Sequence, residues 1–237
     1  MDMQFGLVNL WTEGDIVTRI TSLLLLAMSV ASWMVILLKA LDLRKYARQW
    51  GATERFWQSS DFAEGLDKLG GDPRNPFRTL ATDAQAAARH HRAQSQSQVP
   101  LEVSDWLARC FRHSLDESTA QLQSGLAILA SVGSTAPFVG LFGTVWGIHH
   151  ALLSIGVAGQ ATIDRVAGPI GEALIMTALG LAVAIPAVLG YNALVRGNKS
   201  IVLKLNRFTR DLHAYYVTGA RVSTGVATPA VALKQGS

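Results

Sequence analysis

Three long stretches of the chain lack charged side chains, and this pattern constrains the fold more than any other feature. The first runs from Ile20 to Leu38, the second is most apolar at 126–153, and the third runs from Ala173 to Val195. A helix needs about 20 apolar residues to cross the roughly 30 Å hydrocarbon core of a bilayer. The sequence therefore predicts an all-α integral membrane protein with transmembrane helices at 20–38, 126–153 and 166–195.

The first stretch is predicted to remain as an uncleaved helix. The segment before it carries Asp2, Glu13 and Asp15 against a single Arg19. A signal peptide has a basic start and an apolar core of only about 7–15 residues. This stretch is preceded by acids and is longer than such a core.

Basic residues follow the first and third stretches and are nearly absent between the second and third. Four basic residues, Lys39 and Arg44 among them, lie at 39–48 after the first stretch, and five more lie at 196–210 after the third. Only Arg165 lies between the second and third stretches. Basic loops stay on the cytoplasmic side, so all three spans agree on an N-terminus outside and a C-terminus inside. The predicted segments are an outer N-terminal segment at 1–19, a cytoplasmic segment at 39–120, an outer turn at 154–165, a cytoplasmic helix extension at 196–217 and a disordered tail at 218–237.

The cytoplasmic segment is predicted to be mostly helical, and the second and third spans are predicted to extend far into the cytoplasm. No residue from Ser104 to Leu153 except Pro137 clearly stops a helix, and such a helix would be about 75 Å long. Turn residues lie at 70–76, where the sequence reads Gly-Gly-Asp-Pro-Arg-Asn-Pro. The alternating Ser and Gln at 94–100 predict a linker.

Small residues mark a packing face on the second and third spans. Gly140, Gly143, Gly147 and Gly180 lie there, and Gly143 to Gly147 is a GxxxG motif. Membrane helices associate closely where small residues let their backbones approach. The motif fits both helix pairing within one protomer and a tightly packed oligomer. Three helices can hardly enclose a pore, which favours a ring-forming oligomer.

Prolines lie inside two of the predicted spans. Pro137 is in the second and Pro186 in the third. A proline removes one backbone hydrogen bond and kinks a helix. We predict kinks that shape a cavity, although membrane helices also tolerate such prolines without a special role.

Glu172 is the candidate for proton chemistry, because it is the only carboxylate between Asp164 and Arg196. An acid at bilayer depth normally faces a bundle interior or a cavity, where it marks proton and ion pathways. The spacing also allows Glu172 to lie just outside the membrane. Thr144 and Thr177 add hydroxyl groups that either line a polar pore or bond back to their own helices.

Other functional classes lack their signals. The chain contains no phosphate-binding loop with a lysine, no HExxH and no GxSxG. Cys110 is the only cysteine, so an intrachain disulfide is excluded and a cysteine-based metal site is not expected. We predict no enzymatic activity, no cofactor, no metal and no nucleic-acid partner.

Two ordered blocks resemble the MotA/TolQ/ExbB proton-channel family. The first reads PFVGLFGTVWGI at 137–148, and the second begins GPIGEAL at 168–174 and continues to Asn192. The resemblance implies a bacterial inner-membrane location and a ring around a dimer of a single-span partner. It also implies that Glu172 works with a transmembrane Asp of that partner, and that Thr144 and Thr177 face the pore.

Within the family, the approach from Asp164 to Pro169 and the short acidic N-terminal segment look more like the ExbB branch. That branch implies a pentamer around ExbD, which draws on the proton motive force and passes its output to TonB for import of iron–siderophore, haem or cobalamin. The TolQ branch, which serves envelope maintenance with TolR and TolA, is the alternative, whereas MotA has four spans. A passive scaffold and a carrier are further alternatives; the absence of an internal repeat weakens the carrier. Membrane lipids are expected partners of the basic face after Arg196.

Overall fold

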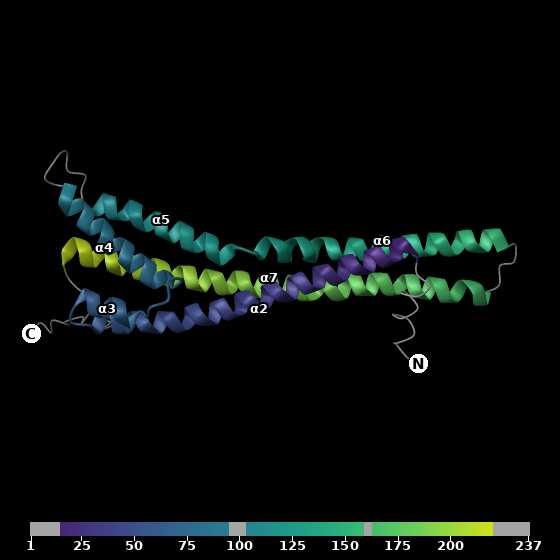
Figure 1. Ribbon diagram of the computed structural model, residues 1–237, viewed down its shortest axis with the longest axis horizontal. Coiled ribbons are helices and arrows are strands. Elements are labelled where there is room, and N and C mark those ends of the chain that lie inside the picture. The colour runs from purple at the N-terminus through teal and green to yellow at the C-terminus, as the bar shows by residue number, and fades with distance from the viewer. Residues whose placement is uncertain (1–14, 95–102, 159–162, 220–237) are drawn as a thin grey trace, which may run out of the picture. The chain divides into compact units, whose positions relative to one another are not determined.

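The computed structural model describes residues 15–94, 103–158 and 163–219, and all the regular secondary structure within these stretches is helical (Figure 1). The helices are α2 (Ile16–Gln58), α3 (Phe62–Lys68), α4 (Pro76–Gln94), α5 (Val103–Gln123), α6 (Leu126–Ala158) and α7 (Ile163–Thr218). The predicted outer segment 1–19, linker 94–100 and tail 218–237 lie mostly outside the described residues.

Three helical stretches are long and apolar enough to cross a membrane. They are Ile16–Gln58, Ser104–Leu153 and Ala173–Thr218, and their most apolar windows have mean hydropathies of 2.2, 1.7 and 2.2. The predicted all-α class with three membrane-crossing helices is therefore confirmed.

The residues form two compact units. The apolar unit comprises Met1–Leu43 and Leu122–Lys199, and the charged unit comprises Arg44–Gln121 and Ser200–Ser237. The apolar unit contains α6 and the first parts of α2 and α7, and the charged unit contains α3, α4, nearly all of α5 and the remainders of α2 and α7.

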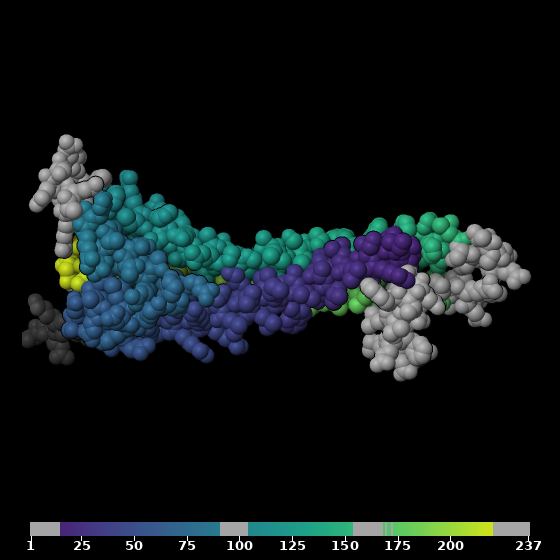
Figure 2. Space-filling model, in the orientation of Figure 1, coloured from purple at the N-terminus to yellow at the C-terminus, as the bar shows by residue number. Residues whose placement is uncertain are grey.

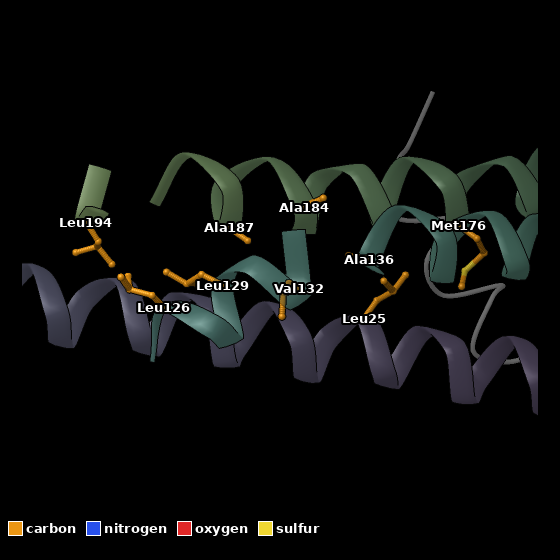
Figure 3. Packing of buried hydrophobic residues seen from close by; sticks show 9 residues of the cluster. All are labelled: Leu25, Leu126, Leu129, Val132, Ala136, Met176, Ala184, Ala187 and Leu194. Carbon is orange, nitrogen blue, oxygen red and sulfur yellow. The ribbon is translucent and has the colours of Figure 1, made fainter. Parts of the chain in front are cut away.

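The apolar unit has a core built from three helices (Figure 3). Its outer surface is equally apolar: Leu37 is 58% exposed, Phe138 70% and Leu189 64%. Figure 2 shows the N-terminal half of α2, in purple, lying open on one face. Exposed apolar surface of this extent is typical of contact with lipid or with another chain. The buried core residues are Leu25 of α2, Leu126, Leu129, Val132 and Ala136 of α6, and Met176, Ala184, Ala187 and Leu194 of α7.

The helix that we predicted to run unbroken from Ser104 to Leu153 is divided into α5 and α6, so that prediction was wrong. The break lies at Ser124 and Gly125, where Gly125 has a φ of +82°. Glycine adopts this left-handed conformation without steric cost. A Cβ atom on Gly125 would also lie 3.3 Å from Cγ1 of Val35 in α2. Pro137 lies inside α6 and Pro186 inside α7, and their kinks stay predictions.

Side chains from α2 and α7 donate hydrogen bonds to residues at this break. Asn198 is buried, and its Nδ2 donates a hydrogen bond of 2.7 Å to the carbonyl of Leu122. Lys39 Nζ donates one of 2.8 Å to Ser124 Oγ. The carbonyl groups at a helix end lack intrahelical partners, so Asn198 satisfies a group that the break leaves free.

We expect Asn198→Leu to destabilise the protein by about 1–3 kcal/mol, because it leaves the Leu122 carbonyl buried without this donor. Thermal unfolding in detergent measures the change. Asn206→Leu is the matched control. The Asn206 amide donates a hydrogen bond of 2.9 Å to the carbonyl of Val202, which lies in the same helix, so its loss breaks no hydrogen bond between helices. Equal shifts of melting temperature for both variants would contradict the assignment.

The charged unit is organised around aromatic side chains and a tight turn. Phe208 of α7 contacts Phe56, Trp57 and Phe77, with ring centroids 5.5–6.0 Å apart. The predicted turn at 70–76 lies between α3 and α4. Buried Asn75 accepts a hydrogen bond of 3.0 Å from the Phe77 N–H, which is the contact of an N-cap, so the Pro76 that follows is the first residue of α4.

Candidate functional site at the contact of α6 and α7

Two glycines bring the backbones of α6 and α7 into direct contact. A Cβ atom on Gly140 would lie 2.6 Å from the carbonyl oxygen of Met176, and one on Gly180 would lie 2.7 Å from that of Ala136. Real Cβ contacts are essentially never shorter than 3.0 Å. Any larger residue at either position must push the two helices apart, since the obstructing atoms belong to backbone.

The other predicted glycines continue the same stripe along α6. A Cβ on Gly143 would lie 3.0 Å from Cε of Met176, and one on Gly147 would lie 2.9 Å from Cβ of Ala173. Positions 140, 143 and 147 share one face of a helix because they are three and four residues apart. The GxxxG motif therefore packs against α7 of the same chain, and it carries no information about a second copy.

Thr144 lies in this contact and joins the two helices through its hydroxyl group. Its Oγ1 is 2.5 Å from Oγ1 of Thr177 and 3.1 Å from the carbonyl oxygen of Ala173, both in α7. It is also 3.2 Å from the carbonyl oxygen of Gly140 in its own helix. A hydroxyl has one proton to donate and two lone pairs. The bond to Gly140 is the bond within the helix that the sequence allowed, the contact with α7 was not predicted, and a pore-lining role for Thr144 stays a prediction.

The Thr144 hydroxyl is buried, and its partner Thr177 is partly buried. Thr144 is 6% exposed, and Met176, which precedes Thr177 on α7, is fully buried. A polar group at such a place is retained only where it is hydrogen-bonded. Either hydroxyl can be the donor to the other, so the direction of this hydrogen bond can reverse, which is a property required of a group that passes on a proton.

Glu172 lies within α7, nine residues after the helix begins at Ile163. Its side chain lies outside the described part of the structure. Its backbone directly precedes Ala173, whose carbonyl accepts from Thr144. The rise of one residue along a helix is about 1.5 Å, so the backbone of Glu172 is at the level of the Thr144 contact.

Within residues 15–94, 103–158 and 163–219, no three His, Cys, Asp or Glu side chains gather in a group that could hold a metal ion.

A hydrogen bond between the start of α2 and α6 was not predicted from the sequence. Trp146 Nε1 donates to Asp15 Oδ2 over 3.0 Å. The two residues are 131 positions apart. Only the tertiary structure pairs Trp146 with this acid.

These features define an integral membrane protein whose second and third apolar stretches meet at a glycine-lined contact that contains a pair of hydrogen-bonded hydroxyl groups. Residues 78–207 match the MotA/TolQ/ExbB proton channel family, and this range includes the whole of that contact. The chain belongs to this family.

Curated relatives cover most of the chain. Biopolymer transport protein ExbB of Xanthomonas campestris pv. campestris is 42% identical over 233 residues, which covers 92% of this chain and 91% of that protein. Biopolymer transport protein ExbB of Neisseria meningitidis serogroup A is 39% identical, covering 85% and 92%. Tol-Pal system protein TolQ of Pseudomonas aeruginosa is 34% identical, covering 87% and 90%. The family is one of membrane transport proteins, in keeping with the class predicted from the sequence.

Proposed function

We propose that the chain is the proton-channel subunit of an ExbB-type motor that energises TonB-dependent import across the outer membrane. The observation that carries this proposal is the similarity to the ExbB proteins of Xanthomonas campestris and Neisseria meningitidis, whose identities of 42% and 39% exceed the 34% of TolQ of Pseudomonas aeruginosa. One charge crossing 100 mV is worth about 2.3 kcal/mol. Several protons per cycle therefore supply enough free energy for a mechanical step.

The proposed proton path uses Glu172, Thr144 and Thr177. Glu172 takes up a proton from one side and releases it to the other, in concert with an Asp of an ExbD-like partner. The hydroxyl pair supports this assignment, because Thr144 contacts both Thr177 and the carbonyl of Ala173, the residue that follows the acid. Gly140, Gly143, Gly147 and Gly180 hold the helices close enough for that contact.

The proposed assembly is a homopentameric ring around an ExbD-like dimer, which passes its movement to TonB. The exposed apolar surface of the apolar unit suits both a neighbouring copy and lipid. The distribution of basic residues supports an orientation with the N-terminus in the periplasm and the C-terminus in the cytoplasm of a bacterial inner-membrane protein. The predicted segment boundaries, from the span at 20–38 to the extension at 196–217, are part of this proposal.

We expect Thr177→Val to lower proton-driven uptake about tenfold while the protein still assembles. Valine keeps the shape of threonine but cannot exchange a hydrogen bond with Thr144. Thr177→Ser, which keeps the hydroxyl, is expected to retain most of the uptake. Equal uptake by the Val and Ser variants would remove Thr177 from the proton path.

Complementation decides between import and the TolQ-like alternative, which the similarity to TolQ keeps open. The chain and its co-encoded partner are expressed in one strain that lacks the ExbB pair and in another that lacks the TolQ pair. We expect restored uptake of ferric siderophore in the first and no restored detergent resistance in the second. The opposite pattern would assign the chain to envelope maintenance, and no rescue in either strain would favour a passive scaffold.

A further inference from the structure

Asp15 caps the N-terminus of α2 and also accepts a hydrogen bond from α6. Its Oδ1 accepts from the N–H of Ile16 over 2.7 Å, and its carbonyl accepts from the N–H of Arg19 over 3.0 Å. Its Oδ2 accepts from Trp146 Nε1 over 3.0 Å. The bond from Trp146, followed by that from Ile16, lowers the pKa of Asp15, so the ionised carboxylate is the acceptor.

The indole ring of Trp146 is itself held along α6. Its centroid lies 6.4 Å from that of Phe142 and 6.1 Å from that of His149. The N–H group therefore points toward α2 from a ring whose neighbours precede and follow it on the same helix. The ring is thus flanked on both sides by aromatic neighbours of its own helix.

Trp146 and Thr144 are on nearly opposite sides of α6. Two residues correspond to about 200° around an α-helix. Thr144 contacts α7 through Ala173 and Thr177, and Trp146 contacts α2 through Asp15. A helix held at two opposite points at one level cannot turn about its own axis without breaking one of the contacts.

We propose that the hydrogen bond between Asp15 and Trp146 is a positioning contact, which fixes the rotation of α6 so that the Thr144 hydroxyl stays against Thr177. The inference rests on the proposed function, because it assigns the pair a role in proton passage through that hydroxyl contact. Asp15 and Trp146 act through Thr144 and do not touch the proton themselves.

Three variants separate this role from the alternatives. Trp146→Phe removes the N–H donor, keeps the ring and leaves the cap of α2 intact. Asp15→Asn keeps an oxygen that accepts from Trp146 and a good helix cap, but it removes the charge. Asp15→Ala removes both. The partner-containing complex is reconstituted in liposomes, and proton flux is measured per assembled complex.

We expect Trp146→Phe and Asp15→Ala to lower proton flux about fivefold, the factor that corresponds to losing a hydrogen bond of ordinary net strength. Asp15→Asn should keep most of the flux. In a Thr177→Val background, Trp146→Phe should cost nothing further, because both changes act on one contact. Loss of flux in Asp15→Asn with full flux in Trp146→Phe would show that the charge matters instead and would overturn the proposal.

A distance measurement tests the positioning role even if the wild-type complex conducts no protons. Spin labels are placed in a Cys110→Ser chain at Leu23 of α2 and Val145 of α6, both about half exposed. We expect a narrow distribution of distances for the wild type and Asp15→Asn, and a broad one for Trp146→Phe. A narrow distribution in all three would overturn the proposal, whereas absent wild-type flux alone would count against the proposed function.

Discussion

Gly180→Leu is expected to leave little correctly assembled protein in the membrane. The first added carbon would lie 2.7 Å from the carbonyl oxygen of Ala136 and 3.0 Å from Cα of Gly140. Both obstructing atoms belong to the backbone, so no side chain can turn away to make room. Overpacking of a dense interior costs about 1–3 kcal/mol and sometimes more, and we expect this case at or above the upper value.

The amount of monodisperse protein extracted in detergent, together with its melting temperature, measures the effect. Gly51→Leu is the matched control, because a Cβ at Gly51 in α2 meets no atom within 4 Å. It should accumulate and melt like the wild type. Normal accumulation and melting of Gly180→Leu would mean that α6 and α7 do not pack at this glycine.

Glu172→Gln is expected to abolish proton-driven uptake in cells while leaving the amount of assembled complex unchanged. Glutamine keeps the size and polarity of the side chain but cannot take up and release a proton near neutral pH. Glu172→Asp keeps the ionisable group on a shorter stem, and we expect it to retain a measurable fraction of uptake. The loss should exceed the tenfold loss expected of Thr177→Val, because the hydroxyl groups only assist passage.

Uptake of a labelled siderophore, normalised to the complex recovered with its ExbD-like partner, is the measurement. Wild-type uptake by Glu172→Gln would reduce the acid to an interfacial residue. The scaffold alternative would then become the better account of the chain.

The sequence identified the membrane-crossing helices because their signal is local. A run without charge such as 20–38 is visible whatever it packs against, and length alone relates it to the bilayer. The family blocks at 137–148 and 168–174 were visible for the same reason. They supplied a role for Glu172 that its spacing left undecided.

The break at Gly125 was missed because its causes are distant in the chain. Glycine is common in membrane helices, so its presence did not signal an end. The left-handed conformation of Gly125 is accompanied by Lys39 on Ser124, 85 residues away, and Asn198 on Leu122, 76 residues away. No local pattern records such pairs.

The glycine stripe was recognised without its partner. Small residues at 140, 143 and 147 indicate a close contact, but the sequence does not say which helix makes it. The structure assigns the contact to α7, where Met176 and Ala173 oppose the stripe. The Thr144 hydroxyl bonds back to its own helix, as one of the two alternatives had it, and it also contacts Thr177 because the glycines bring α7 within reach.

Proton flux through the purified chain and its ExbD-like partner tests the central claim most directly. The complex is reconstituted in liposomes containing a pH-sensitive dye, and a defined membrane potential is imposed. We predict potential-driven acidification that requires both proteins and is lost in Glu172→Gln. Flux no greater than that of empty liposomes, or equal flux with Glu172→Gln, would contradict the account of this chain as a proton channel that works through Glu172.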